Sequence, residues 1–168
     1  MSLLLWLPLN DGTITNQGLS SITVAKGSNV TLDNAGKIGK CMSCTVNSNQ
    51  TVTITLSDLA SHLANGQKYS LAGWFKLTNQ VSNGWIVKLG TNTCGLWWAN
   101  SEARYVWTEN DNGKRCANPT ISSDFTNWHH LVTTVDKSVN GTITAKHYVD
   151  GLPAASYESH TWSNSGQS

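Results

Sequence analysis

Residues Asn127–Ser156, NWHHLVTTVDKSVNGTITAKHYVDGLPAAS, decide the fold of this chain. Two runs rich in β-branched and aromatic residues, WHHLVTTVD and TITAKHYVD, are joined by a short polar segment that ends in Asn140-Gly141. The pair Asp150-Gly151 then precedes a third short run, and Asp-Gly suits the positive φ angles of a tight hairpin turn. The stretch therefore predicts three consecutive antiparallel strands.

The rest of the chain repeats this pattern of short β-type runs between turn clusters, which is typical of an all-β sandwich. Strands are expected at residues 3–7, 21–25, 29–32, 37–46, 51–56, 68–77, 84–90, 93–99, 104–109, 127–136, 142–149 and 153–157. One short helix is expected near residues 58–64, with Ser57 as its cap and Asn65-Gly66 at its end. At 168 residues, we expect a single domain over residues 1–168.

Several of these runs resemble one known family. Trp-His-His-Leu-Val, Thr-Val-Asp and Tyr-Val-Asp-Gly resemble the signature hairpins of laminin-G-like, concanavalin-A-type jelly rolls. The segments YSLAGWFKL (Tyr69–Leu77), GWIVKLG (Gly84–Gly90) and GKIGKCMSCTV (Gly36–Val46) are similar to other strands of that family. The resemblance spans Leu3 to about Tyr157 and implies an antiparallel jelly-roll β-sandwich. The opening LLLWLPLN…NQGLS is also similar to the starts of structural proteins of phages and prophages.

The end of the chain departs from the family pattern. A laminin-G-like domain continues past the Tyr-Val-Asp-Gly hairpin into further strands, whereas only Trp162–Ser168 remain here, largely as an expected loop. Either the chain is a fragment of a longer protein, or a neighbouring copy supplies the missing strands. Leu3–Leu7, expected as a strand that is apolar on both faces, would need such a partner. We therefore expect a homo-oligomer.

Composition limits the classes of partner. Apolar residues make up 39% of the chain, charged residues 12%, and the net charge is +1. A chain with no basic excess has no field to hold a phosphate backbone, so we expect no nucleic acid partner. No apolar run is long enough for membrane insertion, and the apolar start lacks the basic leader and cleavage site of a signal peptide.

Catalytic and metal sites are not expected from the residue pattern. Glycosidases of this fold place paired carboxylates on one strand, but the only acids two residues apart are Glu109 and Asp111, in an expected turn. His129 and His130 are adjacent in a strand and so point to opposite faces; at most one would be a buried partner for a backbone carbonyl. We expect no catalytic residues, no metal ligands and no cofactor. Calcium at loop residues stays open as an alternative, with Asp111, Asp124 and Asp136, together with Asn110 and Asn112, as the candidate ligands.

The four cysteines, Cys41, Cys44, Cys94 and Cys116, admit three interpretations. Cys41 and Cys44 lie three apart in an expected strand, which opposes a shared zinc ion because they would face opposite sides. A Cys94–Cys116 disulfide is a second alternative. The third is four mostly buried free thiols.

Eight tryptophans are far more than a chain of this length usually carries. Trp6, Trp74, Trp85 and Trp128 fit core or sheet-face positions. The pair Trp97-Trp98 cannot face one core, and a hairpin would bring the following strand beside it. Aromatic faces edged by amides and charges suit sugars, so the candidate ligand-binding set is Trp97, Trp98, Asn100, Arg104, Tyr105, Trp107 and Glu109. The alternative is that one tryptophan is core and the other packs under a loop or a subunit.

We therefore expect a non-catalytic binding or structural module, on a phage or prophage particle, that recognises carbohydrate or a host-surface glycan. Its partners would include other virion proteins, and its location would be the virion or an extracellular surface after synthesis in the cytoplasm. One alternative is a purely architectural, oligomerising virion component without a ligand. A glycoside-processing enzyme is the third.

Overall fold

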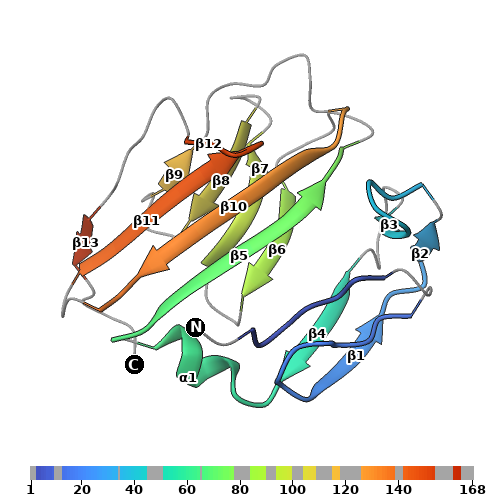
Figure 1. The fold of residues 1–168 in the computed structure, drawn as a ribbon, viewed down its shortest axis with the longest axis horizontal. Helices are drawn as coiled ribbons and strands as arrows, with labels where there is room; N and C mark the ends of the chain where they lie inside the picture. Colours follow the sequence, from blue (N-terminus) through green and yellow to red (C-terminus); the bar gives the residue numbers. More distant parts are fainter. Residues whose placement is uncertain are drawn as a thin grey trace. The chain divides into compact units, whose positions relative to one another are not determined.

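The computed structural model describes residues 3–9, 13–33, 35–44, 51–64, 66–77, 84–89, 94–99, 104–108, 115–117, 126–138, 142–153 and 161–163. The chain divides into two compact units, Met1–Ala60 and Ser61–Ser168. Every strand pair is antiparallel, and one short helix, α1 (Leu59–Leu63), is present (Figure 1). The predicted all-β antiparallel class with one short helix is confirmed.

The first unit contains two small strand pairs. Strand β1 (Ile22–Lys26) pairs with β4 (Val52–Leu56), and β2 (Val30–Asp33) pairs with β3 (Cys41–Cys44). The predicted strand over residues 37–46 begins later than expected, at Cys41, since residues 37–39 form bends before β3.

The segment before β1 is not the strand that its apolar run predicts. Leu3–Leu7 carries no strand, and it is held beside residues 16–20 by hydrogen bonds from Gln17, Leu19 and Ser20 to its carbonyl groups. The strand prediction failed here because the Asn16 side chain hydrogen-bonds backbone groups of this segment that a strand pair would use.

Asn16 organises this opening segment. Its Oδ1 accepts hydrogen bonds from the amides of Trp6 (2.7 Å) and Gly18 (2.8 Å), and its Nδ2 donates to the carbonyls of Leu4 (2.8 Å) and Ser20 (2.6 Å). Gly18 is required by the close approach, because a Cβ there would lie 2.5 Å from the Leu4 oxygen. These backbone groups of the opening segment therefore find their hydrogen-bond partners in residues 16–20.

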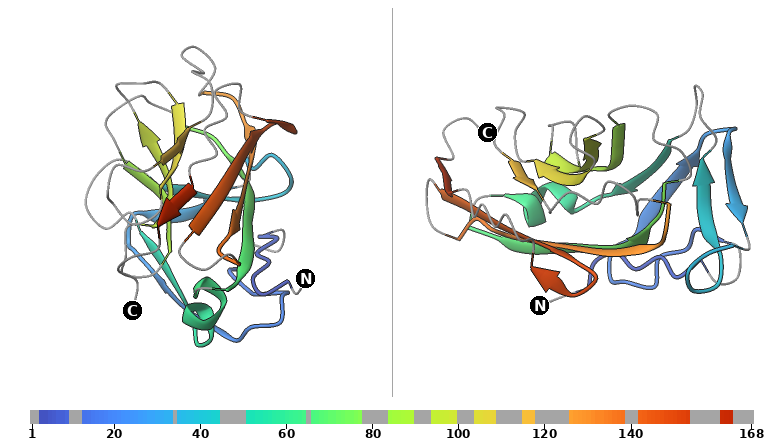
Figure 2. Two further views of the ribbon diagram at one scale, coloured as in Figure 1. Left: turned by 90° about the vertical axis from the view of Figure 1, so that its left-hand side faces the viewer. Right: turned by 90° about the horizontal axis from the view of Figure 1, so that it is seen from above.

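The second unit is a sandwich of two sheets. One sheet has the strand order β12-β11-β10-β5 and contains β5 (Lys68–Phe75), β10 (His129–Asp136), β11 (Thr142–Val149) and β12 (Leu152–Pro153). The other has the order β6-β7-β8-β9 and contains β6 (Gly84–Leu89), β7 (Cys94–Ala99), β8 (Arg104–Thr108) and β9 (Arg115–Ala117). Figure 2 shows the two sheets stacked face to face.

Two short strands were missed by the sequence prediction. Strand β13 (Thr161–Ser163) pairs with the free edge of β11, at the opposite end of β11 from β12. Strand β9 lies in a region expected as a loop. Each has three residues, too few to show a period-two pattern. The residues after the Tyr-Val-Asp-Gly hairpin thus add one more strand to the sheet. The single-domain and homo-oligomer expectations stay predictions.

The core lies between the two sheets. Leu96 and Trp98 of β7 cluster with Leu131 and Val135 of β10 and with Ala145 of β11. Alternate residues of β10 are buried, as expected for a strand with one face on a core and the other toward solvent. The inner face of β10 thereby fixes which side of β7 turns inward.

Two polar side chains enter this interior. The hydroxyl of Thr133 on β10 and Nδ1 of His147 on β11 share a hydrogen bond of 2.7 Å across the strand pair. His147 is fully buried, and this desolvation lowers the pKa of its imidazole from 6.5 to about 4. The ring is therefore neutral in the folded protein at neutral pH.

Lys137 follows the last residue of β10 and contacts the end of α1. It is buried, its Nζ donates to the carbonyl of Leu63 (3.2 Å), and its ammonium lies 5.6 Å from the ring centroid of Tyr69. A cation at the last carbonyls of a helix stabilises the helix end. The predicted short helix is thus joined to the sheet through β10.

Replacing Asn16 by Ala should loosen the opening segment. Four hydrogen bonds would be lost, and each contributes roughly 0.5–1.5 kcal/mol net, so the amides of Trp6 and Gly18 should exchange with solvent much faster. Native-state hydrogen exchange measures this directly. Thr15→Ala is the control, because the Thr15 hydroxyl bonds only to the exposed Thr13 hydroxyl. Unchanged protection in Asn16→Ala would contradict the role assigned to this side chain.

His147 should make the fold sensitive to mild acid. Its folded pKa of about 4 lies below the unfolded value of 6.5, so its stabilising effect is complete above pH ~6.5 and is lost as the pH falls toward 4. The loss should reach about 3 kcal/mol. Denaturant titrations of the wild type and of His147→Gln across this range test it. The wild-type curve should fall more steeply, and parallel curves would contradict the prediction.

Candidate functional site

The adjacent tryptophans of β7 lie on opposite faces of their sheet. Trp98 is 3% exposed and packs in the core beside Leu96, whereas Trp97 is half-buried on the outer face. Successive side chains of a strand alternate between faces, so burying one of the pair forces the other outward. The sequence argument that both cannot face one core is confirmed, and the structure assigns the core position to Trp98.

Trp97 has an aromatic neighbour on β6. Trp85 is its cross-strand partner, with ring centroids 6.4 Å apart and planes tilted by 38°. This separation lies within the range over which aromatic pairs attract each other. Trp85 remains 41% exposed, so the pair presents one open ring supported by a second, partly covered one.

A cation completes the cluster. Nζ of Lys88 lies 5.8 Å from the ring centroid of Trp85, within cation–π distance. We name these three residues, Trp85, Lys88 and Trp97, the Trp85 platform. It combines a flat apolar surface with a positive charge over the Trp85 ring.

A β-bulge makes the platform possible. Trp85 and Lys88 are three residues apart and would face opposite sides of a regular strand. The register of β6 against β7 shifts between Trp85 and Val87, which brings Trp85 opposite Trp97 and Lys88 opposite Gly95 on the same face. Gly95 has φ 149°, and a Cβ there would lie 2.1 Å from the Val87 carbonyl oxygen. Glycine is therefore required where the bulged strand approaches.

The indole of Trp97 carries an unused donor. Its Nε1 is buried and has no hydrogen-bond partner among the described residues. Buried donors are paired in the great majority of cases, and leaving one unpaired costs roughly 1–3 kcal/mol. Because this N–H group is shielded from solvent, it adds no donor to the exposed surface of the platform.

The other predicted site residues fall into three groups. Asn100 and Glu109 lie outside the described residues. Tyr105 and Trp107 are backbone partners of Trp98 and Leu96, in the rows of the core residues. Arg104 is the partner of Ala99, on the same face as Trp97. The predicted hairpin thus brings the strands together, but its register does not place all the residues on one face. Their ligand-binding role stays a prediction.

Trp85 and Lys88 were missed as site residues. Composition and spacing predict a core or sheet-face position for Trp85 and no role for Lys88. Regular alternation would separate the two, and the bulge that reunites them carries no signal in β6 itself. Gly95, a glycine inside a strand pattern, was the one available sign of a bulge.

A second aromatic pair lies on the outer face of the other sheet. Trp74 of β5 and His130 of β10 are cross-strand partners, with ring centroids 5.0 Å apart and planes tilted by 41°. Trp74 is 38% exposed. It is therefore on the outer sheet face rather than in the core.

Asp150 explains the histidine pair. Its carboxylate accepts hydrogen bonds from Nδ1 of His129 and from the backbone amide of His130, both at 2.8 Å. Asp150 itself has φ 52° at the turn into β12. Desolvation raises the pKa of Asp150, but the hydrogen bonds from His129 and from the His130 amide outweigh it and the net shift is downward.

His129 is buried and His130 is not, as predicted for adjacent strand residues. Nδ1 of His129 contacts the Asp150 carboxylate, and the expected backbone carbonyl partner of the buried histidine stays a prediction. The interaction joins the start of β10 to the end of β11 and is structural.

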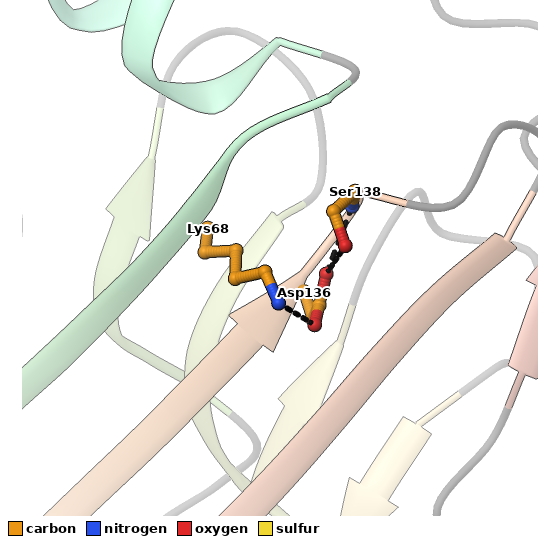
Figure 3. Close-up of polar contacts among 3 residues, drawn as sticks. All are labelled: Lys68, Asp136 and Ser138. Carbon is orange, nitrogen blue, oxygen red and sulfur yellow. Dashed lines mark hydrogen bonds and ion pairs between the residues drawn. The ribbon is translucent and has the colours of Figure 1, made fainter.

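Of the candidate calcium ligands, only Asp136 lies in the described part of the chain. No group of three His, Cys, Asp or Glu residues there could hold a metal ion. Asp111 and Asp124 lie outside it. Asp136 is engaged by Lys68 (2.7 Å) and Ser138 (Figure 3), and these contacts lower the pKa of its carboxyl group to about 2.

The four cysteines lie on three different strands. Cys41 and Cys44 are free thiols at the two ends of β3; Cys44 is exposed, and partial burial raises the pKa of its thiol. The expectation of mostly buried thiols is therefore wrong for Cys44. Cys94 on β7 and Cys116 on β9 are separated by β8. Strands two apart lie about 10 Å from each other, beyond the ~7 Å between Cα atoms that a disulfide can bridge.

The buried Trp98 and the exposed Trp85 should respond very differently to replacement by alanine. Trp98→Ala should lower the free energy of unfolding by about 3–5 kcal/mol, because it opens a cavity in the core. Trp85→Ala should cost about 1 kcal/mol, the contribution of one aromatic pair. Denaturant titrations followed by far-UV circular dichroism compare them. Equal losses would show that the inner and outer faces of β7 are wrongly assigned.

Comparison with known proteins supports the fold. The family model described as the concanavalin A-like lectin/glucanases superfamily, of laminin-G type, matches residues 47–168. Comparisons with curated proteins and with solved structures found no match. Within the described residues, no helix has the length and apolarity to span a membrane. The match covers well over half of the sequence and includes both sheets of the second unit, so the chain belongs to the concanavalin A-like lectin/glucanase superfamily.

Proposed function

We propose that the protein is a non-catalytic module that binds carbohydrate through the outer face of the β6–β9 sheet. The observation that carries this proposal is the Trp85 platform, an exposed indole ring that packs against Trp97 and has the Lys88 ammonium over it. A flat ring can stack on the C–H face of a sugar. The ammonium group of Lys88 can bind its oxygen atoms.

The preorganisation of the platform supports binding. Trp97 is held between two neighbouring strands, and the bulge beside Gly95 is fixed by close backbone contact. A rigid aromatic side chain loses little conformational entropy when a ligand binds. Family membership is compatible with this role, because the superfamily includes lectins by its description.

The absence of catalysis is part of the proposal. Among the described strands, only β2 and β10 contain a carboxylate, one in each, so no strand there carries two acids on alternate residues. Glycoside hydrolysis requires two carboxyl groups across the scissile bond. For the acids outside the described residues, an assay for hydrolysis of the bound glycans tests this part of the proposal.

The proposed setting is a phage or prophage particle. It is supported by the similarity of the opening LLLWLPLN…NQGLS to such structural proteins and by a polar surface with few charges. On a particle, the module would recognise a host-surface glycan and contact other virion proteins, and repeated copies would increase avidity.

An architectural role without a ligand is the second candidate. It is favoured by the Trp74–His130 pair, whose partly exposed ring on the other sheet is suited to contact with another protein. Aromatic side chains are enriched in protein interfaces. The two functions would use different sheets of the sandwich: carbohydrate binding the β6–β9 sheet, and the architectural role the sheet that contains Trp74.

Glycan-array screening followed by tryptophan-fluorescence titration tests the proposal. The wild type should bind at least one glycan class, and Trp85→Ala should weaken that binding about ten-fold or more, as for a central aromatic contact. Trp74→Ala is the matched control, since it removes an equally exposed tryptophan from the other sheet. Equal losses in both variants, or no glycan bound, would favour the architectural role.

A further inference from the structure

The charged residues of the β6–β9 sheet all have the same sign. Its strands contain Lys88, Arg104 and Arg115 and no aspartate or glutamate. This contrasts with the other sheet, where Lys68 is neutralised by Asp136. In a chain of net charge +1, such segregation is a local property of this sheet.

The backbone register places these basic positions on one face. Lys88 pairs with Gly95, Gly95 with Thr108, and Thr108 with Arg115, so one row of the sheet begins and ends with a basic residue. Directly paired positions belong to the same face of a sheet. Four strands extend over about 14 Å at the usual spacing.

Arg104 joins the same set of positions. It pairs with Ala99, and Gly95, Trp97 and Ala99 alternate along β7 on one face. The row between these two contains Trp85, Trp97, Val106 and Ala117. The aromatic row of the platform is therefore flanked by a row with two basic positions on one side and by Arg104 on the other.

We infer that the ligand of this face is an anionic polysaccharide, one whose sugars carry carboxylate, sulfate or phosphate groups. This inference rests on the proposed carbohydrate-binding function and names the class of sugar. The aromatic row would stack on the sugar rings. The basic positions on both sides would attract the anionic groups along the chain.

Charge complementarity supports this class of ligand. The ammonium of Lys88 forms no ion pair with a described carboxylate, and the strands of its sheet offer none. Each exposed ion pair strengthens binding by up to about five-fold, and several pairs together make binding depend on salt. A neutral sugar would offer these basic residues no opposite charge.

Paired polymers that differ only in charge test the inference. Fluorescence titrations compare polygalacturonate with its methyl-esterified, neutral form, and dextran sulfate with dextran; a phosphate-bearing teichoic acid is the third anionic probe. At least one anionic polymer should bind much more tightly than its neutral counterpart. That binding should weaken strongly between about 10 mM and about 1 M salt, as the screening length falls from about 30 Å to about 3 Å.

Substitutions assign the effect to this face. Lys88→Gln, Arg104→Gln and Arg115→Gln should each weaken binding of the anionic polymer several-fold. Lys146→Gln is the matched control, because Lys146 is exposed on β11 of the other sheet. This variant should bind the anionic polymer as tightly as the wild type. Thermal melts show whether each variant is folded. The Lys88→Gln variant should fold, because Lys88 is exposed on β6. It therefore tests the inference even where an arginine variant is unstable.

The outcomes separate the inference from the proposed function. Equal, salt-independent binding of charged and neutral polymers, abolished by Trp85→Ala, would overturn the anionic class and leave carbohydrate binding in place. Binding of duplex DNA as tightly as the best polysaccharide would also overturn it, since the face would then be a general polyanion surface. No binding to any polymer would remove the proposed function as well.

Discussion

The packing of Trp98 and Leu96 against the inner face of β10 determines the rest of the second unit. Leu131, Val135 and the neighbouring Ala145 form the other side of this contact. Once Trp98 is buried, the alternation of a strand leaves Trp97 on the outer face. The bulge opposite Gly95 then adds Trp85 and Lys88 to the same face. A hydrophobic contact on one side of a strand thus produces a candidate binding surface on the other side.

The β10–β11 pair that provides this inner face is stabilised by polar contacts at several points. Asp150 joins the turn after β11 to the start of β10 through His129 and the His130 amide. Thr133 and His147 bond across the middle of the pair, in the interior. At the other end, Lys137 reaches the carbonyl of Leu63, and the outer face carries the Lys68–Asp136 ion pair. These contacts specify the register that the apolar residues alone would leave open.

Most of the strands could be predicted from the sequence because their signals are local. The runs that became β5, β6, β7, β8, β10 and β11 have enough residues to show β-type composition, and Asp150-Gly151 marks a turn by its backbone requirement. The three-residue strands β9 and β13 are too short for such a signal. Leu3–Leu7 has the composition of a strand, but Asn16 bonds its backbone in another conformation.

The candidate site was less predictable, since it depends on faces and register rather than on composition. An aromatic cluster around Trp97 was visible in the sequence, but which indole is buried depends on the packing of the opposite sheet. The inclusion of Trp85 and Lys88 depends on one extra residue in β6. Such a shift reverses the face of every residue that follows it.

The central claim is that the tryptophans of the β6–β9 sheet are divided between a core and an open outer face, the face proposed to bind carbohydrate. Hydroxyl-radical footprinting with mass spectrometry tests it most directly, because oxidation of each indole reports the access of solvent to that ring. The account predicts rapid oxidation of Trp85, slow oxidation of Trp98, and protection of Trp85 when a bound polysaccharide is present. Similar oxidation rates for Trp85 and Trp98 in the free protein would contradict it.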